Sequence, residues 1–353
     1  MMDRAQIWKH LDSLAKPSRS LGRLEDAAVR LAEVQGTLTP TTRPRRLVLF
    51  AGDHGVCAQG VSEWPQEVTA LMVGTILRGR AASSAFAAAH DCVMRVVDVG
   101  VASSYELPTD DARASHRTAR VVRGTRDLSS EPALSVHEFE AAWNVGAEEA
   151  AICAQAGDVI LIAGEMGIGN TTPAACLTML LADAPADVAV GRGAGASDAT
   201  LERKRNLVSR AAERAAHLAR SDIRKAIAAV SGAEIAAMAG FFAEGARGGK
   251  TLLLDGYVAT AAALIAERLQ PGTSRQMIAA HLSAEPGHRV ALKRLGLDPL
   301  LDWSMRLGEG TGALVALPML DSAAALLRNV ASLAELGALE ESPAAVCDGT
   351  RKL

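Results

Sequence analysis

Residues 158–173 read DVILIAGEMGIGNTTP. The stretch from Asp158 to Ala163 is rich in β-branched and leucine side chains, which is typical of a strand buried in a parallel sheet. Glycines and polar residues follow at once, and an alanine- and leucine-rich segment of helical length comes after them. This order of strand, turn and helix predicts one unit of an α/β fold.

The same order recurs along the chain. Further apolar runs that end in glycine or a polar residue are Arg46 to Ala51, Val93 to Val99, Thr251 to Leu254 and Gln276 to His281. The recurrence predicts parallel strands joined by helical crossovers. Because ligands of open α/β sheets bind outside the carboxyl ends of the strands, we expect polar residues from distant stretches to meet there in one cleft.

Both ends of the chain differ from the middle. Helical patterns mark Ile7 to Leu14, Leu24 to Val34 and Ala313 to Leu339. We therefore expect residues 1–38 to begin a small helical domain and residues 39–290 to form a large α/β catalytic domain. Residues 291–353 are expected to add a glutamate-containing active-site loop and the helices that complete the small domain. The arginine-rich stretch 109–131 has no predicted place.

The composition is that of a globular chain, with 49% hydrophobic and 22% charged residues among 353. A net charge of -3 offers no positive field for nucleic acid or anionic lipid. Glycines and Pro173 interrupt the uncharged run from Met166 to Ala182, and the first residues contain no uninterrupted apolar region. We expect a cytoplasmic protein with small-molecule ligands, reduced cysteines, and no nucleic-acid or membrane partner.

The segment from Gly164 to Pro173 has the features of a phosphate-binding loop. Its glycines let backbone N–H groups approach an anion, and Asn170 and Thr171 stand where a helix begins. It is not a Walker A loop, because no lysine precedes Thr171. The alternative is a glycine-rich turn with a helix cap at Asn170 or Thr171.

A second glycine-rich loop, Gly191 to Asp198, precedes a helix that carries Lys204 in its first turns. Lys204 is placed to reach a phosphate seated on the loop. The alternative is a solvated basic face, which suits the neighbouring Arg203 and Arg205.

Glu165 and Glu309 both stand among glycines and are the best acid–base candidates. Glu309 also suits the N-terminus of a helix, and Glu165 beside an anion site is costly unless something cationic binds there too. The chain has no GxSxG and no HxH, HExxH or CxxC spacing, which argues against a serine hydrolase and against a metal site. The residues alone indicate a soluble α/β enzyme acting on a phosphorylated small molecule.

Together the motifs resemble the nicotinate-nucleotide:dimethylbenzimidazole phosphoribosyltransferase family of cobalamin assembly. The matching segments, in family order, are Lys16-Pro17, Ser20 to Glu25, Ala51 to Val56, Gly60 to Ser62, Val68-Thr69, Gly164 to Pro173, Gly193 to Asp198, Asp255-Gly256, Ser283 to His288 and Leu307 to Ala313. The resemblance implies a Rossmann-like, mostly parallel sheet flanked by helices. It also implies a small helical domain built from the N- and C-terminal segments, and a homodimer.

The reaction that the resemblance implies is transfer of phosphoribose from nicotinate mononucleotide to 5,6-dimethylbenzimidazole. The products are α-ribazole 5′-phosphate and nicotinate, and no metal or organic cofactor is required. One alternative is the same transfer to another benzimidazole, a purine or a phenol. Others are a nucleotide-binding protein without turnover and a glycosidase-like hydrolase that uses both glutamates.

The resemblance also assigns roles. Glu309 is similar to the family's general base, and Glu165 to the glutamate near the ribose. The phosphate and ribose site corresponds to Gly167, Asn170, Thr171, Lys204, Gly193 and Gly195. Walls of the base pocket are expected at Met166, Leu307, Ser83, Ser84, Phe86 and Gln66. Two departures, Arg19 for a common glycine and Ala194 for a common threonine, leave the base selectivity open.

Overall fold

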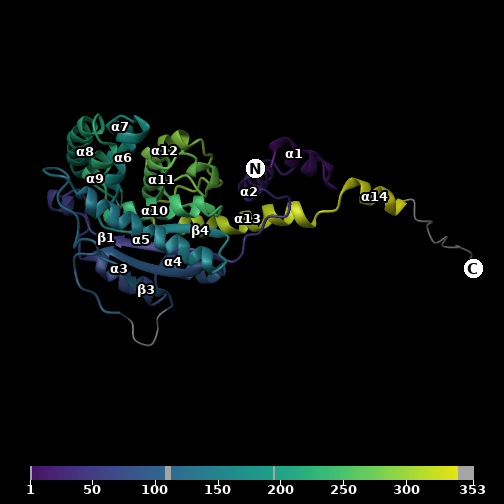
Figure 1. The fold of residues 1–353 in the computed structure, drawn as a ribbon, viewed down its shortest axis with the longest axis horizontal. Coiled ribbons are helices and arrows are strands. Elements are labelled where there is room, and N and C mark those ends of the chain that lie inside the picture. The colour runs from purple at the N-terminus through teal and green to yellow at the C-terminus, as the bar shows by residue number, and fades with distance from the viewer. Residues whose placement is uncertain (1, 108–112, 194, 341–353) are drawn as a thin grey trace, which may run out of the picture. The chain divides into compact units, whose positions relative to one another are not determined.

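The computed structural model describes residues 2–107, 113–193 and 195–340. Its centre is a six-stranded sheet in the order β3-β2-β1-β4-β5-β6 (Figure 1). Every neighbouring pair in this sheet is parallel. The strands are β1 (Arg45–Gly52), β2 (Val93–Gly100), β3 (Ser115–Thr118), β4 (Ile160–Met166), β5 (Thr251–Leu254) and β6 (Met277–Ala279). The predicted α/β fold with a parallel, Rossmann-like sheet is confirmed.

The strand order places a reversal between β1 and β4. From β1 the chain moves outward to β2 and β3, then returns to the other side of β1 and continues through β4, β5 and β6. Loops at such a reversal diverge to opposite faces and leave a crevice at the carboxyl ends of the strands. The segments after β1 and β4 are therefore the expected walls of a ligand site.

The helices that connect or follow the strands lie on both sides of the sheet (Figure 1). They are α3 (Val68–Leu77), α4 (Ala82–Ala89), α5 (Val136–Gln155), α6 (Thr171–Ala182), α7 (Ala186–Ala189), α8 (Asp198–Ala219), α9 (Ile223–Val230), α10 (Ala233–Arg247), α11 (Tyr257–Leu269) and α12 (Gly287–Leu295), with short 3-10 helices η1 (Gly55–Gln59) and η2 (Thr273–Gln276).

Both faces of the sheet are buried, as expected for parallel strands. On β1, Phe50 points to α10 and meets Phe241 edge to face at 5.7 Å between ring centroids. Leu47, three residues earlier, contacts the opposite side, where a Cβ on Gly310 would lie 2.6 Å from its side chain. The strand thus separates a helical core from the loop that carries Glu309.

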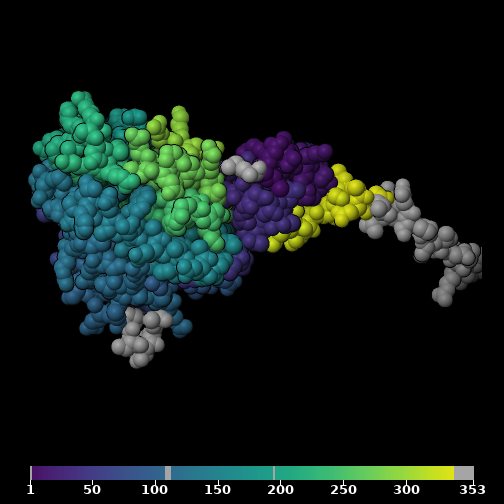
Figure 2. All heavy atoms as spheres, in the orientation of Figure 1, coloured from purple at the N-terminus to yellow at the C-terminus, as the bar shows by residue number. Residues whose placement is uncertain are grey.

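Helices α5 and α10 pack closely because glycines line their contact. A Cβ on Gly146 would lie 1.7 Å from the Ala237 carbonyl oxygen, and one on Gly240 would lie 2.0 Å from that of Trp143. In the space-filling view, teal residues of α5 lie next to green residues of the later helices in the same unit (Figure 2). The chain therefore joins segments about a hundred residues apart into one core.

The chain divides into two compact units, one of Met1–Thr41 with the segment from Met319 onward and one of Thr42–Pro318. The terminal unit contains α1 (Arg4–Ser13), α2 (Arg23–Gln35), the end of α13 (Thr311–Asn329) and α14 (Leu333–Glu340). The sequence placed the second boundary at residue 290, whereas the larger unit runs to Pro318. The difference arises because Asp255 of the sheet domain holds the first residues of α13.

Arg19 has a backbone φ of 61°, in the left-handed region that favours glycine. Its guanidinium lies 3.5 Å from the centroid of the Trp8 ring and bonds Asp12 at 3.1 Å. These side-chain contacts offset part of the cost of the conformation. The arginine thus has a local structural role in the terminal unit.

The described part of the arginine-rich stretch forms β3 and the loop that follows it. Arg117 bonds Glu149 on α5 at 2.9 Å, and Arg120 bonds Asp98 on β2 at 2.6 Å. These arginines attach the edge of the sheet to its neighbours. Residues 109–112 lie outside the described residues.

Candidate active site

The loop after β4 stands at the sheet reversal and fits closely against the segment after β1. A Cβ on Gly167 would lie 2.3 Å from the Gly52 carbonyl oxygen, so only glycine fits there. Gly169 has a φ of 87°, and a Cβ on it would lie 2.5 Å from Cys57 Sγ. The Ile168 N–H between them donates to Thr69 Oγ1 at 3.1 Å. The glycines thus let the ends of two strands pack closely, in addition to leaving the backbone of the loop accessible.

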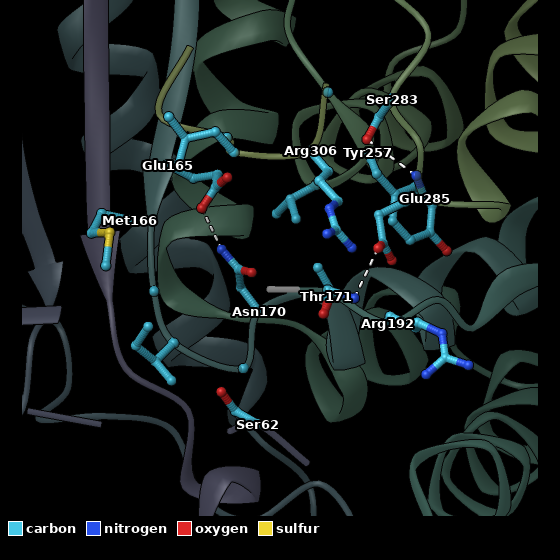
Figure 3. A pocket seen from close by; sticks show the side chains of 18 of the residues that line it. Ser62, Glu165, Met166, Asn170, Thr171, Arg192, Tyr257, Ser283, Glu285 and Arg306 are labelled. Carbon is cyan, nitrogen blue, oxygen red and sulfur yellow. Dashed lines mark hydrogen bonds between the residues drawn. The ribbon is translucent and has the colours of Figure 1, made fainter. Parts of the chain in front are cut away.

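One pocket collects this loop and several others (Figure 3). Its lining comes from residues 61–63 after β1, 165–171 at and beyond the end of β4, 192, 193 and 196 in the second glycine-rich loop, Lys204, 255–259 after β5, 281, 283 and 285 after β6, and 306–308 before α13. The expectation that polar residues after different strands meet in one cleft is confirmed.

Lys204 lines the pocket beside the start of α6. Its Nζ donates to Thr171 Oγ1 at 2.7 Å and to the Gly191 carbonyl oxygen at 3.3 Å. The side chain is buried, and this burial lowers the pKa of Lys204 to about 8, against the opposing attraction of Glu285. An ammonium has three protons, so one remains for an anion in the pocket. Lys204 is therefore not part of a solvated basic face. Arg203 and Arg205 do not line the pocket, so that alternative remains open for these two residues.

Glu285 shapes the second glycine-rich loop. Its Oε1 accepts the Gly193 N–H at 2.8 Å, and a Cβ on Gly191 would lie 2.2 Å from its Oε2. Sequence reasoning quoted this glutamate within a motif but assigned it no role, because its partner is 92 positions away. Gly195 has a φ of 112° and is not among the residues that line the pocket, and Ala194 lies outside the described residues.

Glu165 is buried at the end of β4 and faces the pocket. It accepts a hydrogen bond from Asn170 Nδ2, and Gly308 packs so closely that a Cβ would lie 2.2 Å from Glu165 Oε1. Burial, followed by the neighbouring carboxylates of Asp255, Glu234 and Glu309, raises the pKa of Glu165 well above its usual range. Such a group becomes an anion readily only when a positive charge arrives beside it.

Glu309 itself is not among the residues that line the pocket, although Leu307 and Gly308, which precede it in the chain, are. Its Oε2 accepts the Ser83 hydroxyl at 2.7 Å, and its backbone φ is 60°. Burial raises the pKa of Glu309, and the hydrogen bonds from Ser83 oppose this. A buried carboxylate with a raised pKa is the type of group that acts as a general base near neutral pH.

Asp255 holds the loop that carries Glu309. Its carboxylate accepts the backbone N–H groups of Gly310 at 3.1 Å, Gly312 at 2.7 Å and Ala313 at 3.1 Å. A carboxylate at the N-terminus of α13 also interacts favourably with the helix dipole. The position of Asp255 after β5 marked it as a cleft residue, but no sequence pattern linked it to residues 310–313.

The predicted base-pocket residues fall into two groups. Met166 and Leu307 line the pocket. Ser83, Ser84 and Phe86 lie on α4 and Gln66 lies before α3, and none of these four is among the lining residues. Ser83 reaches Glu309, and the Ser84 hydroxyl bonds the Ala81 carbonyl oxygen at 2.9 Å.

The described residues contain no group of three or more His, Cys, Asp or Glu side chains suited to a metal ion. His54 lies 2.9 Å from Glu234, and both side chains are fully buried. Among the described helices, α13 alone is long and apolar enough to cross a membrane, and 61% of its apolar window is buried inside the protein. Burial of this kind is typical of a core helix.

Comparison of the sequence with protein families and with known proteins finds phosphoribosyltransferases. A family model described as phosphoribosyltransferase matches residues 2–337. Nicotinate-nucleotide–dimethylbenzimidazole phosphoribosyltransferase of Thermus thermophilus is 45% identical over 94% of this chain and 97% of its own. The enzyme of that name from Ralstonia nicotianae is 43% identical over 97% of this chain and 95% of its own.

Solved structures agree with the curated relatives. The crystal structure of CobT from Thermus thermophilus superposes with a TM-score of 0.88 at 45% identity, covering 95% of this chain and 98% of that one. A fold shared at this level, together with sequence identity over nearly the whole length of both chains, shows that the protein belongs to the nicotinate-nucleotide:dimethylbenzimidazole phosphoribosyltransferase family.

Proposed function

We propose that this protein transfers the phosphoribosyl group of nicotinate mononucleotide to 5,6-dimethylbenzimidazole, releasing nicotinate and forming α-ribazole 5′-phosphate for the nucleotide loop of cobalamin. One observation carries the proposal: Lys204 and the buried Glu165 line a single pocket at the sheet reversal, and the buried Glu309 directly follows its lining residues Leu307 and Gly308. The reaction requires a cation for the phosphate and a carboxylate for proton removal, and both belong to this pocket or to the loop that borders it.

The 5′-phosphate of the donor is proposed to bind over Lys204 and Thr171. The third ammonium proton and the start of α6 both favour a dianion there. Gly167, Asn170, Gly193 and Gly195 are proposed to complete the phosphate and ribose site, by motif and, except for Gly195, by their place on the pocket wall.

The chemistry suits a carboxylate at Glu165. In nicotinate mononucleotide the leaving nitrogen is already a pyridinium, so the bond from nitrogen to the ribose carbon breaks without a general acid. The electron pair of that bond leaves with the nicotinate nitrogen, and positive charge develops on the ribose carbon. Ionised Glu165 near that carbon stabilises the transition state more than the ground state, which is what lowers a barrier. The pyridinium itself favours ionisation of this buried group on binding.

Glu309 is proposed to remove the N–H proton of the benzimidazole. The other ring nitrogen then attacks the ribose carbon from the face opposite the leaving group, which inverts the β anomer to the α anomer. Met166 and Leu307 offer apolar walls for the ring, as an apolar ligand requires. Ser83, Ser84, Phe86 and Gln66 remain proposed neighbours of the base.

The test is incubation of purified protein with nicotinate mononucleotide, with and without dimethylbenzimidazole, followed by chromatography and mass spectrometry. Formation of the α-ribotide and nicotinate only when the acceptor is present is the expected result. Nicotinate released without acceptor indicates hydrolysis, and no product indicates a binding protein or another acceptor; each result contradicts the proposal. Competition among dimethylbenzimidazole, other benzimidazoles, purines and phenols then measures the selectivity.

On the same resemblance we propose a cytoplasmic homodimer. Light scattering on the purified protein checks the oligomer by its mass, which should be twice the 36.7 kDa of the chain.

A further inference from the structure

Three lysine or arginine side chains line the pocket: Lys204, Arg192 and Arg306. Two of them already have partners within the protein. Lys204 donates to Thr171 and Gly191, and Arg192 donates to Asp198 and to the Ala196 carbonyl oxygen. Arg306 makes no hydrogen bond or ion pair with any residue that the structure describes. It is therefore the one of the three cations left without a protein partner.

Arg306 is nevertheless attached to a well-held backbone. The carbonyl oxygen of the preceding Met305 accepts the Ala284 N–H at 2.9 Å. Two residues after Arg306, Gly308 packs against Glu165. The Gly308 carbonyl oxygen accepts the Thr311 N–H at 3.0 Å. Figure 3 shows the Arg306 guanidinium extending from this loop into the pocket. The Arg306 guanidinium is thus directed into the pocket by a loop whose backbone is fixed by hydrogen bonds on both sides of it.

The rest of the pocket is unfavourable for a carboxylate. Four acidic side chains, those of Glu63, Glu165, Asp255 and Glu285, line it. A second anion that enters such a pocket requires a cation of its own, because like charges at close range in a partly buried site repel. Lys204, which donates to Thr171, is already proposed to bind the 5′-phosphate.

The donor of the proposed reaction carries two anionic groups, the 5′-phosphate and the carboxylate of the nicotinate ring. Dimethylbenzimidazole carries none. Resting on that proposed function, we propose that Arg306 binds the ring carboxylate of the donor and so selects nicotinate mononucleotide over nicotinamide mononucleotide. A guanidinium presents parallel N–H donors that match the two oxygens of a carboxylate, and an uncharged carboxamide offers it only one acceptor.

Binding of the two mononucleotides to the protein without acceptor tests the inference. They share the ribose and the phosphate and differ only in carboxylate against carboxamide. Isothermal titration calorimetry is performed on the unmodified protein and on the Arg306→Gln, Arg306→Lys and Arg247→Gln variants. Arg247 is a matched control because it is exposed and pairs with Glu244 on α10, outside the pocket.

We expect Arg306→Gln to weaken binding of nicotinate mononucleotide roughly 10- to 100-fold, the loss that corresponds to a hydrogen-bonded charge pair. Binding of the amide should change less than about 3-fold. Arg306→Lys should give an intermediate loss for the carboxylate, because it keeps the charge and loses the fork. Arg247→Gln should leave both affinities unchanged.

Equal weakening of both nucleotides would place Arg306 at the phosphate or ribose and overturn the inference. Unchanged binding of both, or equal affinities of the unmodified protein for the two, would overturn it as well. Failure of the proposed function appears separately, as absence of base-dependent ribotide in the unmodified protein, because the binding measurement needs no turnover.

Discussion

Three features of Glu309 restrict its position and environment. Its backbone is left-handed, its carboxylate is buried, and one of its oxygens accepts the Ser83 hydroxyl at 2.7 Å. The glycines on both sides let the loop approach β4, where a Cβ on Gly164 would lie 2.8 Å from the Glu309 carbonyl carbon. A side chain held in this way is preorganised to receive a proton.

Replacing Glu309 with glutamine removes the proposed base and keeps nearly the same shape. We expect turnover to fall roughly 100-fold or more, the scale of a lost general base, with folding and binding of nicotinate mononucleotide preserved. Steady-state kinetics and calorimetric binding of the donor check this. Turnover close to that of the unmodified protein would remove Glu309 from the role.

Replacing Ser83 with alanine should shift the pH dependence of kcat/KM. Burial raises the pKa of Glu309 and the Ser83 hydrogen bond opposes this rise, so loss of the hydroxyl raises the pKa further. A general base works only when ionised, and kcat/KM falls as pH drops through its pKa. The acid limb of kcat/KM should therefore move to higher pH by about 1 unit, the size of one hydrogen bond to a charged group. Ser83→Thr keeps a hydroxyl and should restore the profile, whereas an unmoved limb in Ser83→Ala counts against the contact.

Lys204 should make the affinity for nicotinate mononucleotide fall as pH rises. Burial lowers its pKa from 10.5 to about 8, so the unliganded site begins to lose its positive charge near pH 8. A bound phosphate is a dianion above pH 7 and favours the charged lysine. Affinity for nicotinate mononucleotide should decrease as pH rises through about 8, measured by calorimetry at pH 7 and pH 9. Lys204→Met should bind weakly at both values, and a pH dependence that survives in this variant would assign it to another group.

The contact between α5 and α10 depends on glycine. Gly146→Ala would place a methyl group 1.7 Å from the Ala237 carbonyl oxygen, so one helix must move. We expect a loss of about 1–3 kcal/mol or more in the free energy of unfolding, as for other overpacked cores. The matched control is Gly337→Ala in α14, where no atom lies within 4 Å. That change should stabilise by about 0.5–1 kcal/mol through helix propensity, and urea denaturation that ranks the two variants in the reverse order would contradict the packing account.

The pocket draws its walls from residues 61–308, almost the full span of the larger compact unit. Unfolding of that unit must therefore destroy the site, and a ligand that binds only the folded state must stabilise it. At a nicotinate mononucleotide concentration of about 100 times Kd, the free energy of unfolding should increase by about 2.7 kcal/mol. Denaturation with and without the nucleotide measures this. Nicotinate riboside, which lacks the phosphate, should stabilise less at the same concentration, and equal stabilisation would argue against the phosphate site at Lys204.

Local patterns were sufficient for the glycine loops and for every described strand except β3, which lies in the arginine-rich stretch that had no predicted place, and they marked Glu165 and Glu309 as acid–base candidates. The apolar runs before Gly52, Gly100, Gly164 and Asp255 became β1, β2, β4 and β5, because a strand of a parallel sheet is apolar on both faces and leaves its mark in the sequence itself. The glycine loops could be identified for a similar reason, since the backbone at Gly167 and Gly169 tolerates no other residue. Resemblance to a known family then supplied the reaction.

Contacts between distant residues were not contained in any local pattern. Ser83 and Glu309 are 226 positions apart, Gly193 and Glu285 are 92 apart, and Asp255 and Gly312 are 57 apart. Gly193, Glu285, Asp255 and Gly312 meet their partners because the order of the parallel strands brings the loops that follow the strands to one edge, and Ser83 reaches Glu309 from the start of α4. A side chain such as that of Arg306 looks like an ordinary surface residue in the sequence, and only the folding of these loops around a pocket makes it one of the residues that line that pocket. Residue types and turns can be identified from short stretches of sequence. The hydrogen-bond partners of a side chain, its burial and the resulting pKa shifts depend on distances that exist only after the sheet has formed.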